Sequence, residues 1–128
     1  MSGLDDLRTE CPELRRRLRR AYQKWVKRGR LRGMRMDTPI YVEKDFWEDF
    51  LHRPGVFNPG LQRVAEREGR NLWTFGELWT HSEAWSDLGE QEAATYTLPG
   101  QGLDAALQFP LQKTMMEVLG GTRGTAHL

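Results

Sequence analysis

The stretch GRLRGMRMDT, residues 29–38, decides the fold, because a helical pattern ends in it and a strand pattern begins. In its second half the side chains alternate: Met34 and Met36 are apolar, and Arg35 and Asp37 are charged. Residues two apart on a strand share a face. The pattern therefore predicts a short strand with methionines toward a core and a guanidinium beside a carboxylate on the other face. Spacing alone fits both a structural ion pair and a functional site.

An amphipathic helix is predicted before this strand. Pro12 suits a first helical position, and Gly29 suits a C-terminal stop. Ten of the 19 basic residues lie between Arg15 and Arg32. We interpret them as the solvated face of the helix; the alternative, a nucleic-acid-binding surface, lacks a recognition motif. The apolar stripe opposite them consists of Leu14, Leu18, Ala21, Tyr22, Trp25 and Val26.

Beyond the strand, helical and strand patterns alternate, which indicates βαβ units and a parallel sheet. The expected fold class is therefore α/β, with about three parallel strands and intervening helices. The expected elements are a helix around Glu43–Leu51, a loop at residues 53–60, a short helix at Leu61–Arg67, a strand within NLWTFGELW (residues 71–79) buried on both faces, a helical connection at His81–Tyr96, and a third strand within GLDAALQFPLQ (residues 102–112) that runs into a helix at Pro110.

Composition narrows the classes of protein. The 128 residues suit one domain, and 29% of them are charged, as is typical of a soluble globular chain. The net charge is +1, so the chain as a whole has no strong positive charge that would attract nucleic acid or a membrane surface. A single cysteine excludes an intramolecular disulfide. The N-terminus has no signal-peptide pattern, so a cytoplasmic location is expected if Met1 is the true start, and the compartment is otherwise unknown.

Two carboxylates stand at predicted strand ends, where α/β folds place their function. Asp37 ends the first strand, and Glu77 ends the second. Arg35 beside Asp37 would lower the pKa of that carboxyl and keep it ionised, whereas apolar neighbours would raise the pKa of Glu77. One charged and one protonated carboxyl is the pair that glycosidic cleavage uses.

Several motifs resemble the catalytic barrel of the α-amylase family, glycoside hydrolase family 13. GMRMDT resembles the Gly-x-Arg-x-Asp signature of its fourth barrel strand, and FGEL resembles the Gly-Glu signature of its fifth. The segments at residues 5–29, DFWEDF at residues 45–50, and GLDAALQFPLQ resemble the approach to the fourth strand, the helix after it, and the sixth strand. The resemblance implies a partial TIM-type (β/α)8 barrel, with residues 1–128 as one fragment of that domain.

Carried over residue by residue, the resemblance implies a retaining glycosidase that cleaves α-glucosidic bonds. Asp37 would be the nucleophile that forms a covalent glycosyl-enzyme, Glu77 the general acid and base, and Arg35 the residue that orients Asp37. Tyr41 and Trp79 would contact the substrate, an α-glucan or maltooligosaccharide. Neither nucleic acid nor a membrane is an expected partner.

The sequence also departs from the family pattern. Tyr41 stands where many members have a histidine that helps to bind sugar or calcium, and Arg32 stands where an acid is usual. No cofactor or metal is therefore expected in this chain, although calcium occurs in full-length members. The third-strand motif Asp-x-x-x-Asn-His and the seventh-strand motif Asn-His-Asp are missing.

These departures leave two hypotheses open. The chain represents a truncated segment of an amylase-type hydrolase, inactive alone, or it is a non-catalytic remnant that acts as an interaction module. Three parallel strands would expose two sheet edges, from which we expect self-association.

Overall fold

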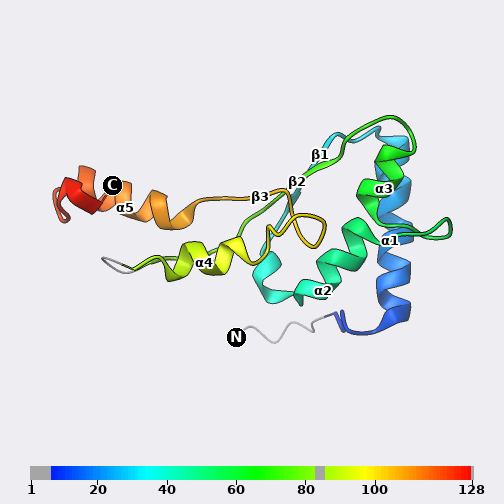
Figure 1. The fold of residues 1–128 in the computed structure, drawn as a ribbon, viewed down its shortest axis with the longest axis horizontal. Coiled ribbons are helices and arrows are strands. Elements are labelled where there is room, and N and C mark those ends of the chain that lie inside the picture. Colours follow the sequence, from blue (N-terminus) through cyan, green and yellow to red (C-terminus); the bar gives the residue numbers. More distant parts are fainter. Residues whose placement is uncertain (1–6, 83–85, 128) are drawn as a thin grey trace.

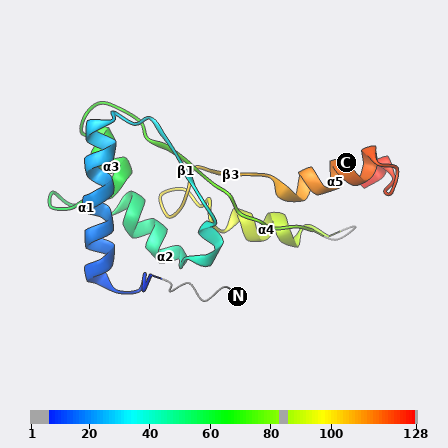
Figure 2. The ribbon, with the colours of Figure 1, turned by 180° about the vertical axis from the view of Figure 1, so that it is seen from behind.

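The computed structural model describes residues 7–82 and 86–127. A three-stranded parallel sheet lies between two groups of helices, with α1, α2 and α3 at one end and α4 and α5 at the other (Figure 1; Figure 2 shows the reverse view). No described helix has the length and apolar character needed to cross a membrane. The strands are β1 (Gly33–Met36), β2 (Trp73–Gly76) and β3 (Ala105–Ala106); the helices are α1 (Pro12–Arg28), η1 (Pro39–Tyr41), α2 (Lys44–Trp47), the π-helical η2 (Glu48–His52), α3 (Leu61–Glu66), α4 (Leu88–Ala94), α5 (Phe109–Leu119) and η3 (Thr125–His127).

The sheet confirms the predicted α/β class with three parallel strands. Its strand order is β1-β2-β3, and Met34 pairs with Thr74 and Met36 with Gly76. The prediction that the second strand is buried on both faces is wrong, because Trp73 is 51% exposed. The buried core lies on the methionine side of the sheet, and the side that carries Trp73 is left open.

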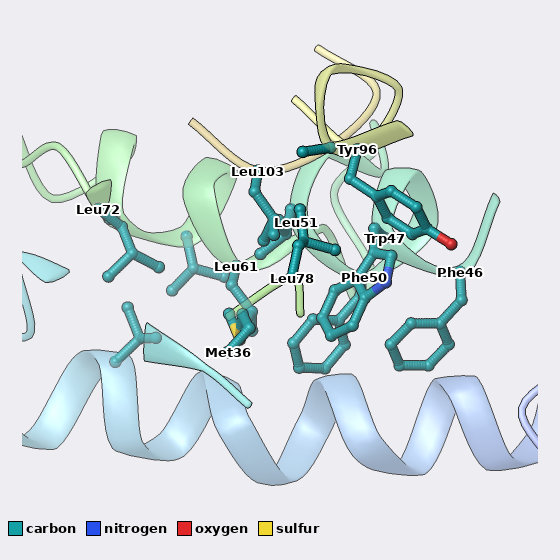
Figure 3. Packing of buried hydrophobic residues seen from close by; sticks show 14 residues of the cluster. Met36, Phe46, Trp47, Phe50, Leu51, Leu61, Leu72, Leu78, Tyr96 and Leu103 are labelled. Carbon is teal, nitrogen blue, oxygen red and sulfur yellow. The ribbon is translucent and has the colours of Figure 1, made fainter. Parts of the chain in front are cut away.

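One continuous helical segment, α2 followed by η2, supplies the aromatic centre of the core. The rings of Phe46 and Phe50 stack 5.2 Å apart, and the indole N–H of Trp47 donates to the Pro39 carbonyl at 3.2 Å. This bond fixes the turn that follows β1, and Figure 3 shows Met36 packed into the same cluster. The buried cluster comprises Val26, Met36, Phe46, Trp47, Phe50, Leu51, Leu61, Val64, Ala65, Leu72, Leu78, Ala93, Tyr96 and Leu103.

The basic face of α1 is not uniformly solvated, which corrects the sequence-based interpretation. Arg15 makes two hydrogen bonds to the Asp45 carboxylate, at 2.9 and 3.2 Å, and lowers the pKa of that carboxyl below its usual value. Arg19 is buried and forms an ion pair with Asp49. Residues four apart lie on one side of a helix, so this side of α1 docks on the acidic side of α2 and η2.

The apolar stripe predicted on α1 is only partly covered. Val26 is fully buried and Leu18 packs against the core, whereas Trp25 is 67% exposed. Tyr22 is partly exposed, although its ring contacts Phe50 edge-on at 5.4 Å. Fewer apolar side chains of α1 are therefore buried in the core than the amphipathic pattern predicts.

A close backbone approach at Gly60 joins η2 to α3. A methyl group on Gly60 would lie 2.3 Å from the Leu51 carbonyl carbon and oxygen and 2.5 Å from the His52 nitrogen. These neighbours are backbone atoms that cannot turn aside. Leu51 and Leu61, on either side of this contact, are both fully buried.

We expect Gly60→Ala to destabilise the chain by about 3 kcal/mol or more, because overpacking against backbone forces the two helices apart. The measurement is the urea midpoint of unfolding followed by circular dichroism. The matched control is Gly33→Ala, whose added methyl group would meet only the Trp73 oxygen at 3.6 Å. Equal midpoints for the two variants would contradict this account of the α3 contact.

Candidate active site

Two carboxylates follow directly after paired strand residues. The last register pair of β1 and β2 is Met36 with Gly76, and Asp37 and Glu77 come next in their strands. The Glu77 N–H continues the ladder by donating to the Met36 carbonyl at 2.9 Å. Neighbouring strands lie about 4.8 Å apart. The backbone therefore holds Asp37 and Glu77 side by side at the carboxyl edge of the sheet.

Arg35 pairs with Glu77, on the neighbouring strand. Arg35 is opposite Phe75 in the register, and Glu77 lies two residues further on the same face. The Arg35 guanidinium donates to the Glu77 carboxylate in an ion pair that is partly open to solvent. The expected pairing of Arg35 with Asp37 is not found, since the structure records no ion pair of Asp37 with any described residue.

The pocket beside β1 contains only part of the predicted site. It measures about 420 Å³, and Arg35 and Asp37 line it together with apolar side chains that include Tyr22, Met34 and Phe46. Glu77 is not among the lining residues. Asp37 and Glu77 thus lie at the same sheet edge, but of the two only Asp37 lines this pocket.

The two predicted substrate contacts lie on exposed segments. Tyr41 ends η1 and is 78% exposed. Trp79 is 69% exposed, and its ring lies 4.7 Å from that of Phe109 at the start of α5. Trp79 and Phe109 line a groove of about 440 Å³ that runs along α5 to Met116.

A polar cluster that sequence reasoning did not single out joins β3 to β2. The Asp104 carboxylate accepts hydrogen bonds from the Thr74 N–H at 2.7 Å and the Thr74 hydroxyl at 2.9 Å. The Gln62 amide donates to the same oxygen at 2.8 Å. Thr74 is fully buried, so Asp104 serves to place the third strand. The one sign of this cluster in the sequence was Thr74, a polar residue inside the apolar run of residues 71–79.

No metal-binding cluster is found across residues 7–82 and 86–127, where no three His, Cys, Asp or Glu side chains gather as ligands would. Of the two carboxylates at the sheet edge, Glu77 pairs with Arg35. The site as described thus offers two carboxylates and one guanidinium.

Comparison with known proteins finds that the chain is similar to several amylase-type enzymes. It is 32% identical over 112 residues to an α-amylase of Streptomyces lividans, which covers 87% of this chain and 11% of that protein. It is 23% identical over 111 residues to a cyclomaltodextrinase of a Bacillus species and 24% identical over 117 residues to a maltogenic α-amylase of Bacillus acidopullulyticus. No protein-family model matches, and no solved structure matches significantly.

The match is therefore to a part of much longer proteins. The chain spans 11% of the Streptomyces lividans protein and 16% of each of the two Bacillus proteins. Three parallel strands with intervening helices are what one piece of a (β/α)8 barrel provides. The chain is therefore similar to part of several α-amylase family members over most of its own length, and its three parallel strands with intervening helices fit a partial barrel.

Proposed function

We propose that this chain carries the two catalytic carboxylates of an amylase-type glycoside hydrolase that acts on α-glucans by retaining cleavage. The observation that carries the proposal is the register that sets Asp37 and Glu77 side by side after β1 and β2. Retaining glycosidases need carboxyl groups about 5–5.5 Å apart, a separation that neighbouring strands allow. The names of the relatives, all amylases or a cyclomaltodextrinase, support the substrate class.

In this proposal the reaction has two displacement steps. Asp37 attacks the anomeric carbon while Glu77 donates a proton to the glycosidic oxygen, so the C–O bond breaks and a glycosyl ester of Asp37 forms. Glu77, now a carboxylate, takes a proton from water, which attacks the same carbon and releases Asp37. Two inversions at one carbon give net retention.

The remaining site residues have positioning roles in the proposal. Arg35 shares a strand face with Asp37, so a turn of its half-exposed side chain from Glu77 toward Asp37 would free the acid and orient the nucleophile. Trp79 offers an exposed ring on which a sugar can stack, and Tyr41 offers a phenol near Asp37 in sequence.

A chimera tests these roles in a complete enzyme. The matching segment of the Streptomyces lividans α-amylase is replaced by this chain, and starch hydrolysis is measured. We expect Asp37→Asn and Glu77→Gln each to lower kcat on the order of 10³-fold or more, because each removes a group that acts in the transition state.

The matched control is Asp87→Asn, which changes an exposed aspartate at the start of α4 and should leave the rate unchanged. An activated 5-fluoroglycosyl fluoride should add its mass to the peptide that contains Asp37. Labelling of a different carboxylate, or equal rates for Asp37→Asn and Asp87→Asn, would contradict the proposal.

We expect the 128-residue chain alone to give no measurable turnover of soluble starch. Asp37 is exposed and the Arg35 face of β1 lies open, whereas catalytic electrostatics need a site that excludes water. The measurement is reducing-sugar release over many hours. Release that disappears in Asp37→Asn would refute this expectation.

A second candidate, a module that binds another copy of itself, is favoured by one observation. The outer side of α5 exposes large apolar residues, with Met115 45%, Met116 64% and Leu119 82% exposed. The sheet edges at β1 and β3 have no further strand among the described residues. Unpaired edges and apolar patches of this kind favour association.

We expect the chain to form dimers or larger species in sedimentation velocity at micromolar concentration. Met116→Glu combined with Leu119→Glu should shift the distribution toward the monomer, since charge on α5 opposes burial of that helix. Leu88→Glu, which alters a residue 69% exposed on α4, is the control. A monomer in all three proteins would exclude this role.

A further inference from the structure

A basic groove lies between α1 and the loop of residues 53–60 and reaches α3. It measures about 630 Å³ and shares no lining residue with the pocket beside β1. Six cationic side chains and one carboxylate line it, together with Gln23, Asn58 and apolar loop residues. The cations are Arg16, Arg19, Arg20, Lys27, Arg53 and Arg67, and the carboxylate is Glu68.

Half of these cations have no ion pair within the part of the chain that the structure describes. Glu68 forms an ion pair with Arg70, which does not line the groove. Arg16 pairs with Glu13 at 2.7 Å, and Arg19 and Arg53 both pair with Asp49. The three cations without an ion pair among the described residues are Arg20, Lys27 and Arg67. The groove therefore keeps an excess of positive charge.

Arg19 adds a buried cation to this excess. It is 3% exposed, and its Nε has no hydrogen-bond partner among the described residues. Among the residues that the structure describes, Asp49 is its one carboxylate partner, and Asp49 is shared with Arg53, which binds it at 2.8 Å. Burial, followed by repulsion from Arg53 and Arg15, lowers the pKa of Arg19 to about 10. A buried cation that shares its one counter-ion gains from a further anion nearby.

The groove is built in advance of any ligand. Asn58 adopts a left-handed backbone conformation, with φ of 53°. Its side chain accepts a hydrogen bond from Gln23 at 3.0 Å and donates to the Arg16 carbonyl at 3.2 Å. Gln23 also donates to the Pro59 carbonyl at 2.6 Å. These bonds hold the loop on α1, so binding here would require little ordering of the chain.

We propose that this groove binds a small oligophosphate anion, either inorganic or as the phosphate tail of a nucleotide. Guanidinium groups match phosphate oxygens in bidentate fashion, and five of them line this cavity, which is of ligand size. Phe57 lines the groove and is 92% exposed, which gives a base a ring on which to stack. This binding is independent of the proposed glucan chemistry.

Calorimetric titration of the whole chain with sodium tripolyphosphate at low salt tests the proposal. We expect one saturable site that weakens as salt is raised. Arg20→Gln and Lys27→Gln should each lower the affinity about tenfold. The control is Lys24→Gln, an exposed cation of the same helix that does not line the groove, with less than a twofold effect. Unchanged urea midpoints show that each variant still folds.

A second titration with ATP identifies the source of the phosphate. Tighter binding of ATP than of tripolyphosphate, lost in Phe57→Ala, assigns the site to a nucleotide, and equal binding assigns it to inorganic oligophosphate. Absence of saturable binding, or equal weakening by Arg20→Gln and Lys24→Gln, overturns the proposal. Tighter binding of duplex DNA that all three variants weaken equally indicates a diffuse basic surface and also overturns it.

Discussion

The parallel register of β1 against β2 is the constraint on which the rest of the structure depends. It pairs Met36 with Gly76, and the bond from the Glu77 N–H to the Met36 carbonyl extends it by one step. A slip of one residue would turn every side chain of a strand to the other face. Arg35 would then enter the core, where an unpaired guanidinium costs several kcal/mol, and Met36 would leave it. The same alternation that builds the core therefore sets the carboxylates in place.

Small residues and polar anchors protect this register. At Gly76 a methyl group would lie 2.4 Å from the Leu103 side chain and 2.8 Å from Pro39, so the sheet passes through the core with no room for a side chain. Asp104 accepts both hydrogen bonds from Thr74 and so fixes β3 against β2 although β3 has only two residues. Beyond the strand, Trp47 holds the turn at Pro39. The register of the strands is thus determined by contacts that form only in the folded chain.

This explains which features the sequence could predict. Alternation within residues 33–37 was enough for the strand and its two faces, and helical spacing was enough for α1, because both are local periodicities. The partner of Arg35 was not predictable, since it depends on cross-strand register. The exposure of Trp73 was missed for a similar reason: an apolar run does not say which face a helix will cover. The burial of Arg19 could have been anticipated from the matching four-residue spacing of Arg15 and Arg19 with Asp45 and Asp49.

The open face of the sheet carries both aromatic and charged side chains, and exposure to water does not account for this combination. Trp73 and Phe75 contact each other at 5.1 Å on the face that bears Arg35 and Glu77. A face selected only for solubility would carry charges, and one selected only for burial would carry aliphatic side chains. This mixture suits the proposed glucan site, since aromatic rings stack on a sugar and charges fix its orientation. In the proposed glucan site, a segment that covered this face would need to supply polar partners for Asp37 as well as apolar cover for Trp73.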